Sequence, residues 1–128
     1  MLKQIGSPIK GPSGQLLPLS AGIEVDGTVY LSGQLALCDG RIVGDDIGEQ
    51  TAMILANIET ILATADLTLQ DIFKASIWLT RREDFPAFNA VFASKFSEPY
   101  PVRSTVVSDL VVDGALIEIE VTATRSRS

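Results

Sequence analysis

Hydrophobic residues recur at helical spacing in two segments of the chain. Between residues 46 and 65, isoleucine and leucine side chains return every three or four positions, with polar residues between them. Asp46 and Glu49 form an Asp-x-x-Glu opening that resembles a capping box, and Asp66 can take the left-handed position that ends a helix. A second helix is predicted after Asp84 as its N-cap, with an aromatic stripe typical of a core-facing helix at Phe85, Phe88, Phe92 and Phe96.

Other segments show the period of two that predicts β-strands. Asp26-Gly27 separates two short apolar runs and predicts a tight hairpin, because glycine tolerates the positive φ of such turns. Gly33-Gln34 interrupts the second of these runs, as a bulge or as a place where backbone approaches a ligand. Further strands are predicted at 74–80, 105–107 and 116–122. The order strands, helix, strand, helix, strands predicts an α+β domain with both helices on one sheet face.

The first part of the chain has no such pattern. Residues 6–18 are rich in glycine, proline and serine, so we expect residues 1–17 to form an N-terminal arm or loop. The remaining residues suffice for one hydrophobic core, and the whole chain of 128 residues is predicted to be a single domain.

Composition narrows the partners that this domain can have. Hydrophobic residues make up 46% of the chain, which favours burial of apolar surface between subunits. The formal net charge of −6 makes nucleic acid and anionic lipid poor electrostatic partners. The basic tail from Arg125 is expected to be a solvated end. No segment resembles a signal peptide or a membrane span, so we expect a cytoplasmic protein.

Missing residue types exclude several chemistries. The chain has no histidine, which removes Ser-His-Asp and Cys-His catalysis, histidine-based zinc sites and haem ligation. Its single cysteine, Cys38, cannot form an intrachain disulfide and fits a reducing compartment. Cys38 follows the usual pattern of an inert lone thiol, and its role is left open.

One arginine and two glutamates are the candidates for chemistry. Arg103 follows Pro99 and Pro101, which restrict the backbone before it, and a guanidinium fork fits a carboxylate in two parallel hydrogen bonds. Glu118 and Glu120 share one strand face, away from the apolar row, where a carboxylate could orient water. The competing interpretations are a surface arginine paired with an acid and a solvated sheet face.

These motifs together resemble those of the RidA family, also called YjgF/YER057c/UK114. The resemblance runs from about Pro18 to about Ala123, and the motifs occur in the family's order and approximate spacing. They are Ser32-Gly33-Gln34, the Asp-x-x-Glu helix opening, Asp84-Phe85 with Asn89, Pro101-Val102-Arg103-Ser104-Thr105 and Ile117-Glu118-Ile119-Glu120.

The resemblance implies a fold, an assembly and an activity. The fold is that of Bacillus chorismate mutase, with a mixed sheet and two helices on one face. The assembly is a homotrimer with three clefts between adjacent subunits. The activity is enamine/imine deamination: water converts 2-imino acids of the 2-aminoacrylate/2-iminopropionate type to 2-oxo acids and ammonia, with no cofactor and no metal.

The resemblance also assigns roles to individual residues. Arg103 binds the substrate carboxylate and Glu118 holds the attacking water, while Glu120 is the second glutamate of that strand. Ser32 and Gly33 line the pocket. Apart from the resemblance, a glycine at this place lets a ligand carboxylate reach backbone N–H groups, with Ser32 as an extra donor, and a plain bulge with no ligand is the competing interpretation. The remaining matches are Thr105, at a position usually held by cysteine whose backbone carbonyl faces the substrate nitrogen, and Asn89 of the second helix.

The chain departs from the family pattern at two places. Leu19 replaces the tyrosine that closes the pocket in the archetype, and the loop before Arg103 is shorter. Both changes indicate an altered substrate preference. The main alternative is a non-catalytic trimeric binding or regulatory protein for 2-oxo acids; ribonuclease activity conflicts with the acidic charge, and chorismate mutase activity rests on fold alone.

Overall fold

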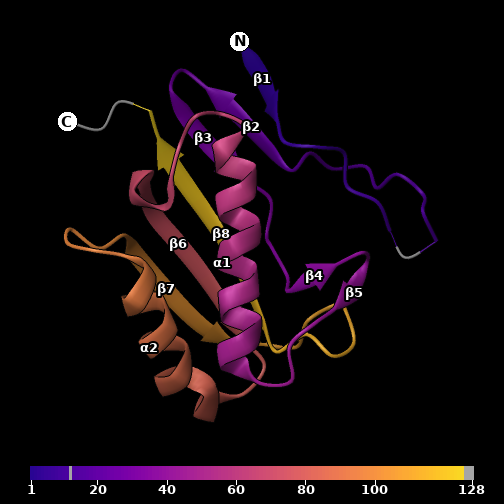
Figure 1. Ribbon diagram of the computed structural model, residues 1–128, viewed down its shortest axis with the longest axis vertical. Coiled ribbons are helices and arrows are strands. Elements are labelled where there is room, and N and C mark those ends of the chain that lie inside the picture. The colour runs from indigo at the N-terminus through magenta and orange to yellow at the C-terminus, as the bar shows by residue number, and fades with distance from the viewer. Residues whose placement is uncertain (12, 126–128) are drawn as a thin grey trace.

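The computed structural model describes residues 1–11 and 13–125, and its elements follow the predicted order (Figure 1). The end of the basic tail, residues 126–128, and Pro12 lie outside the described residues. The strands are Leu2–Ile5 (β1), Gly22–Val25 (β2), Thr28–Leu31 (β3), Leu37–Cys38 (β4), Arg41–Ile42 (β5), Ile72–Leu79 (β6), Val102–Val107 (β7) and Ile117–Thr124 (β8). The helices are Ile47–Ala63 (α1) and Phe85–Lys95 (α2), with 3-10 turns at Leu69–Asp71 (η1) and Arg82–Asp84 (η2).

The main sheet has six strands in the order β1-β2-β3-β8-β6-β7. All neighbours are antiparallel except β6 and β7, which are parallel and connected through α2, so the sheet is mixed. Both helices lie on the same side of this sheet, α1 across β8 and β6 and α2 beside β7 (Figure 1). The predicted α+β class and the placement of the helices are confirmed.

Alternation along the two central strands decides which side chains enter the core. The apolar residues of β6 and β8, among them Ile77 and Ile119, are buried under the helices, where they meet α1 residues such as Ile54 and Ile58. The intervening residues of β8, including Glu118 and Glu120, therefore face away from the helices. This confirms the predicted division between an apolar row and a glutamate row.

Local signals in the sequence set the ends of several elements. The Asp46 carboxylate accepts a hydrogen bond of 2.8 Å from the Glu49 amide at the start of α1, as the capping pattern predicts. The Glu49 carboxylate accepts from the Asp45 amide, one residue before the position that a capping box requires. Asp66 follows α1 with φ 59, and Asp26 and Gly27 turn the β2–β3 hairpin with φ 50 and 85.

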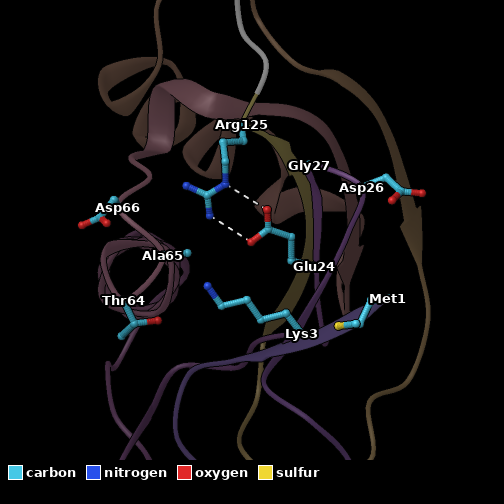
Figure 2. A pocket seen from close by; sticks show the side chains of 9 residues that line it. All are labelled: Met1, Lys3, Glu24, Asp26, Gly27, Thr64, Ala65, Asp66 and Arg125. Atoms are coloured by element: carbon cyan, nitrogen blue, oxygen red, sulfur yellow. Dashed lines mark hydrogen bonds and ion pairs between the residues drawn. The ribbon is translucent and has the colours of Figure 1, made fainter.

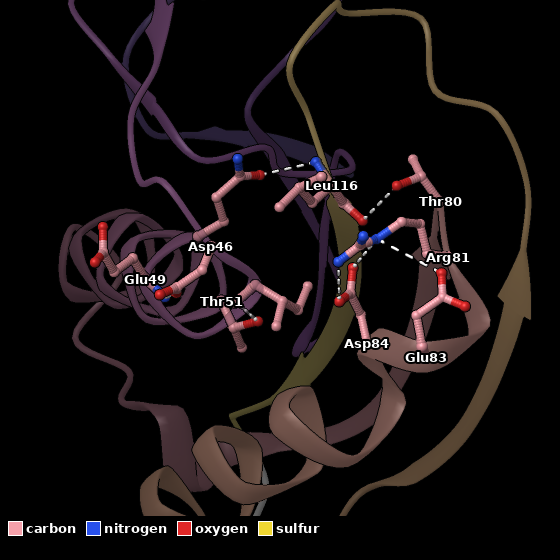
Figure 3. A network of polar contacts seen from close by, with 10 residues as sticks. Asp46, Glu49, Thr51, Thr80, Arg81, Glu83, Asp84 and Leu116 are labelled. Carbon is pink, nitrogen blue, oxygen red and sulfur yellow. Dashed lines mark hydrogen bonds and ion pairs between the residues drawn. The ribbon is translucent and has the colours of Figure 1, made fainter.

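Asp84 does not have the capping role that the sequence predicts. Its carboxylate makes no hydrogen bond to an α2 amide; instead it is buried and accepts two bonds from the Arg81 guanidinium, of 2.8 and 3.2 Å (Figure 3). The physical reason is the turn η2, which brings Arg81 within reach before the helix begins. A bidentate bond to a cation satisfies a buried carboxylate better than a single backbone amide does.

One further expectation is wrong in detail. The arm predicted over 1–17 begins with a strand, because Leu2–Ile5 pairs with the free edge of β2 and buries Ile5. Residues 2–5 contain too few apolar positions to show a period.

The interruption at Gly33 is a β-bulge that rejoins the sheet. Tyr30 pairs with Thr122, and Gln34 pairs with Ile119, so four steps on one strand oppose three on the other. Two backbone bonds between Gln34 and Ile119, of 2.7 and 3.0 Å, restore the pairing. The extra residue leaves the backbone of residues 32 and 33 beside the glutamate row.

The C-terminal end of β8 is tied to the β2–β3 hairpin. Arg125 donates two hydrogen bonds of 2.9 Å to the Glu24 carboxylate, in a hollow that Lys3 also lines (Figure 2). This ion pair lowers the pKa of the Glu24 carboxyl below its ordinary value. Within the described ranges, neither helix is long and apolar enough to cross a membrane.

Candidate functional site

Arg103 lies on the edge strand β7 and projects toward the helices. It is opposite Ala75 in the parallel register of β6 and β7, and Ala75 belongs to the buried, helix-facing row. The side chain therefore passes from the edge of the sheet onto α2. Thr105, two residues along, lies on the same face.

Aromatic rings form a bed under this guanidinium. The Arg103 Cζ atom lies 5.0 Å from the centre of the Phe92 ring, 5.2 Å from Phe88 and 5.8 Å from Phe85. Arginine stacks favourably on aromatic faces, and such contacts hold the planar group in one orientation. Asn89 adds a short hydrogen bond, its Oδ1 accepting from Arg103 Nη2 at 2.6 Å.

The rest of the guanidinium is free for a ligand. No carboxylate lies within ion-pair distance of Arg103 among residues 1–11 and 13–125, so the interpretation as a surface ion pair does not hold. Of its five N–H donors, the described part of the chain engages one, through Asn89. Partial burial lowers the pKa of this guanidinium below its ordinary value, which still leaves it charged at neutral pH. We call Arg103, Asn89 and Thr105 the arginine half-site.

A second cluster surrounds the glutamate row on the other face of the sheet. The bulge places Gly33 directly against Glu118: a Cβ atom at position 33 would collide with the Glu118 carboxylate. Gly33 therefore has no side chain for a steric reason. Its amide N–H and the Glu118 carboxylate have no hydrogen-bond partner within the described ranges. Both groups are available to a ligand or water.

Ser32 and Leu19 lie beside the second glutamate. They line one hollow with Glu120 and Tyr30. The Ser32 hydroxyl donates to the Ser20 carbonyl at 2.6 Å, and its role as an extra donor for a ligand stays a prediction. We call Leu19, Ser32, Gly33, Glu118 and Glu120 the glutamate half-site.

The Glu118 carboxyl has the proton affinity of a candidate general base. Burial raises its pKa above the ordinary value, and the negative charge of Glu120 raises it further. A carboxylate with a raised pKa accepts a proton more readily than a free one does. The carboxylate lies against Gly33 at the bulge.

The two half-sites do not meet within one chain. Glu118 is opposite Trp78 in β6, on the face away from the helices, while Arg103 is opposite Ala75 on the helix face. The structure thus groups Arg103 with Asn89 and Thr105, and separately groups Glu118 with Gly33, Ser32, Leu19 and Glu120. That the two groups converge on one ligand stays a prediction.

Sequence reasoning missed the aromatic bed. The spacing of the phenylalanine stripe predicts core residues, which is right for Phe88, Phe92 and Phe96, but Phe85 remains 38% exposed and contacts the arginine. Tyr30, which is half-exposed beside Leu19, was missed as well. The only sequence signal for the aromatic bed is Asn89, which directly follows Phe88 on the same helix.

Comparisons with known proteins show the family of the chain. The family model described as Endoribonuclease L-PSP matches residues 13–125. The Schizosaccharomyces pombe protein mmf1, mitochondrial, is 34% identical over 119 residues, covering 91% of this chain and 72% of that protein. The 2-iminobutanoate/2-iminopropanoate deaminase of Capra hircus is 31% identical over 125 residues, covering 96% and 90%.

Solved structures show the same fold. The crystal structure of YyfA from Yersinia pestis, of the Rid protein family, has a TM-score of 0.86 at 33% identity and covers 97% of this chain and 99% of its own. RidA from an Antarctic Psychrobacter species gives 0.84 at 29% identity, with 95% and 98% covered. The chain has the chorismate mutase-like fold that these proteins share. It belongs to the Endoribonuclease L-PSP family, the family of RidA and YjgF proteins.

Proposed function

We propose that the protein is an enamine/imine deaminase that hydrolyses reactive 2-imino acids to 2-oxo acids and ammonia. The observation that carries the proposal is the guanidinium of Arg103, which is held on an aromatic bed and, among the described residues, donates to Asn89 alone. An arginine fixed in this way is preorganised for a carboxylate. The family includes a relative named for this reaction.

The reaction needs two copies of the chain. Since Arg103 and Glu118 lie on opposite faces, a molecule bound to Arg103 of one copy meets Glu118 only if a second copy presents it. We propose a homotrimer in which each cleft combines the arginine half-site of one subunit with the glutamate half-site of the next. Exposed apolar residues on the face away from the helices, such as Tyr30 and Val102, fit burial between subunits.

The mechanism follows from the groups in the two half-sites. The substrate carboxylate binds Arg103 in two parallel hydrogen bonds, while the Glu118 carboxylate orients water toward the C=N carbon. Water adds to the C=N carbon while one of its protons passes through Glu118 to the nitrogen, and a neutral carbinolamine forms. Glu118 then takes the hydroxyl proton and delivers it to the nitrogen as the C–N bond breaks, so that the hydroxyl oxygen becomes the 2-oxo group and ammonia leaves. A positioned carboxylate supplies about 10²–10⁴-fold, which suits an imine that already reacts with water.

RNA cleavage, which the family description names, is not the activity that we propose. The chain carries a net charge of −6 and no histidine for acid-base chemistry at neutral pH. We propose a cytoplasmic protein that acts on small carboxylates and binds neither nucleic acid nor membrane.

The direct test generates 2-aminoacrylate from serine with a dehydratase and follows 2-oxo acid release. The wild type should accelerate release, and Arg103→Ala and Glu118→Gln should not. Arg41→Ala, which removes an exposed arginine from β5, is the matched control and should behave as wild type. Acceleration that survives in Arg103→Ala would contradict the proposal, and 2-oxo acid binding without acceleration would indicate a binding protein instead.

A further inference from the structure

The peptide unit between Ser32 and Gly33 has one end held and the other end free. Its carbonyl, on Ser32, accepts a hydrogen bond of 3.0 Å from Nε2 of the Gln34 side chain. Its N–H, on Gly33, has no hydrogen-bond partner in residues 1–11 and 13–125. A trans peptide is planar and directs its C=O and its N–H to opposite sides. The bond that fixes the carbonyl therefore also fixes the direction of the free N–H.

The backbone on both sides of this peptide unit is fixed by other bonds. The Ser32 N–H donates to the Ala21 carbonyl at 2.9 Å, and the backbone of Gln34 is bonded twice to Ile119, at 2.7 and 3.0 Å. These bonds still allow the peptide unit between them to rotate, because glycine accepts a wide range of φ. Among the described residues, the Gln34 side chain is the group that binds this unit directly.

The Gln34 side chain approaches from the helix side of the sheet. Gln34 is opposite Ile119 in an antiparallel pair, and directly opposite residues of such a pair carry their side chains on the same face. Ile119 belongs to the buried, helix-facing row, whereas the Glu118 carboxylate lies against Gly33 on the other face. The Gly33 N–H points away from the Gln34 side chain, and so toward the face that carries the glutamate half-site.

We propose that Gln34 is a positioning residue, whose side-chain amide aims the Gly33 N–H at the carboxylate of the bound substrate. The inference rests on the proposed function, because the ligand is the same 2-imino or 2-oxo acid. A carboxylate has about four acceptor positions and Arg103 takes two of them, so a donor from the other half-site can serve a third. An N–H that is already oriented loses little conformational entropy on binding. Gln34 itself touches no reacting atom.

The substitution Gln34→Met tests this role, because methionine keeps the length of the side chain and removes its donor. One hydrogen bond of this kind shifts an equilibrium by about twofold to tenfold, so the dissociation constant of pyruvate, measured by calorimetry, should rise about threefold to tenfold. The contact is the same in the ground state and the transition state, so the KM for 2-iminopropanoate should rise equally, with kcat within about twofold of wild type.

Two further variants frame that result. Gln34→Glu keeps the shape of the side chain but places an acceptor against the Ser32 carbonyl, so it should raise the dissociation constant and the KM at least as much. Gln4→Met makes the same replacement on the exposed strand β1, away from both half-sites, and is the matched control. It should match the wild type in the dissociation constant, KM and kcat.

The Gly33 amide proton gives a readout that a merely structural role would not move. In NMR spectra of the isotope-labelled wild type, this proton should shift downfield when pyruvate binds, because it then donates to the carboxylate. At saturating pyruvate the shift should be smaller in Gln34→Met. A lower melting temperature in this variant, with the Gly33 shift, the dissociation constant and the KM unchanged, would show a structural role only and overturn the inference.

The outcomes separate this inference from the proposed function. If the wild type binds pyruvate and hydrolyses imines, and Gln34→Met does both equally well, the inference fails and the proposed function stands. If pyruvate shifts the Gly33 proton and Gln34→Met weakens both the shift and the binding, the inference is supported even if no imine is hydrolysed, and the deaminase proposal alone fails. A wild type that does not bind pyruvate overturns the inference, and the turnover assay then decides the proposed function by itself.

Discussion

Arg103 and Glu118 project from opposite faces of one sheet. The strand register settles this, because Ala75 beside Arg103 belongs to the buried row and Trp78 beside Glu118 belongs to the other row. One chain therefore holds a candidate anion-binding group and a candidate base that cannot act together on one small molecule. The proposed reaction thus requires a second copy of the chain to complete the site.

Replacing Gly33 by alanine should lower kcat without unfolding the protein. The new methyl group would take the space of the Glu118 carboxylate, and a flexible side chain can move away from it at small cost. Displacing the Glu118 carboxylate from the water that attacks the C=N carbon should lower kcat about tenfold to a hundredfold. Steady-state kinetics with 2-iminopropanoate, together with a thermal melt, measure both effects.

Gly48→Ala is the control for that substitution. Gly48 lies in the first turn of α1, where a Cβ atom would make ordinary contacts. Activity should stay at the wild-type level, and stability should rise by up to about 1 kcal/mol because alanine favours the helix. Full activity in Gly33→Ala would show that Glu118 needs no fixed place beside the bulge.

Glu120→Gln should move the acid limb of the pH–rate profile to lower pH. Burial and then the charge of Glu120 raise the pKa of Glu118, so the active carboxylate is lost as pH falls through this raised value. Removing the charge of Glu120 lowers the pKa of Glu118, while burial keeps it above the ordinary value. Profiles of kcat/KM between pH 4 and 8 measure the shift; an unchanged limb, or one displaced to higher pH, contradicts the assignment.

Arg103→Lys should weaken substrate binding although the positive charge remains. An ammonium cannot make two parallel hydrogen bonds to a carboxylate, nor does it stack flat on the phenylalanine bed. Loss of one charged hydrogen bond, about 1.5–3 kcal/mol, raises the KM at least tenfold. Arg41→Lys on β5 is the matched control, and equal KM values in the two variants would rule out bidentate recognition.

Arg81→Ala should destabilise the protein although the Arg81 side chain is largely exposed. The substitution leaves the buried Asp84 carboxylate without the two hydrogen bonds that satisfy it (Figure 3). We expect a loss of about 1–3 kcal/mol in the free energy of unfolding, measured by urea denaturation. Arg41→Ala should change it by less than about 0.5 kcal/mol, and a similar small change in Arg81→Ala would show that the pair contributes nothing.

Much of the fold follows from patterns within short windows of sequence. Asp26-Gly27 predicts its hairpin because two adjacent positions need positive φ. Alternation along β8 predicts that Glu118 and Glu120 share a face, since side chains on a strand alternate whatever the strand pairs with. Both inferences depend on local geometry alone.

The remaining features depend on contacts between distant residues. The face that Arg103 occupies follows from its register with β6, and no local pattern encodes that register. Asp84 has the sequence of an N-cap, yet burial and the nearby Arg81 give it an ion pair instead. Phe85 belongs to a core stripe by spacing, but it is the first residue of α2, where the stripe leaves the core.

The most direct test of the shared site mixes two inactive variants. Arg103→Ala keeps Glu118, and Glu118→Gln keeps Arg103, so a cleft that takes its arginine from the second and its glutamate from the first is intact. After equal amounts are unfolded and refolded together, about a quarter of the clefts should be intact, and activity should return to that fraction of wild type. Activity equal to the sum of the separately refolded variants would contradict a site built from two copies of the chain.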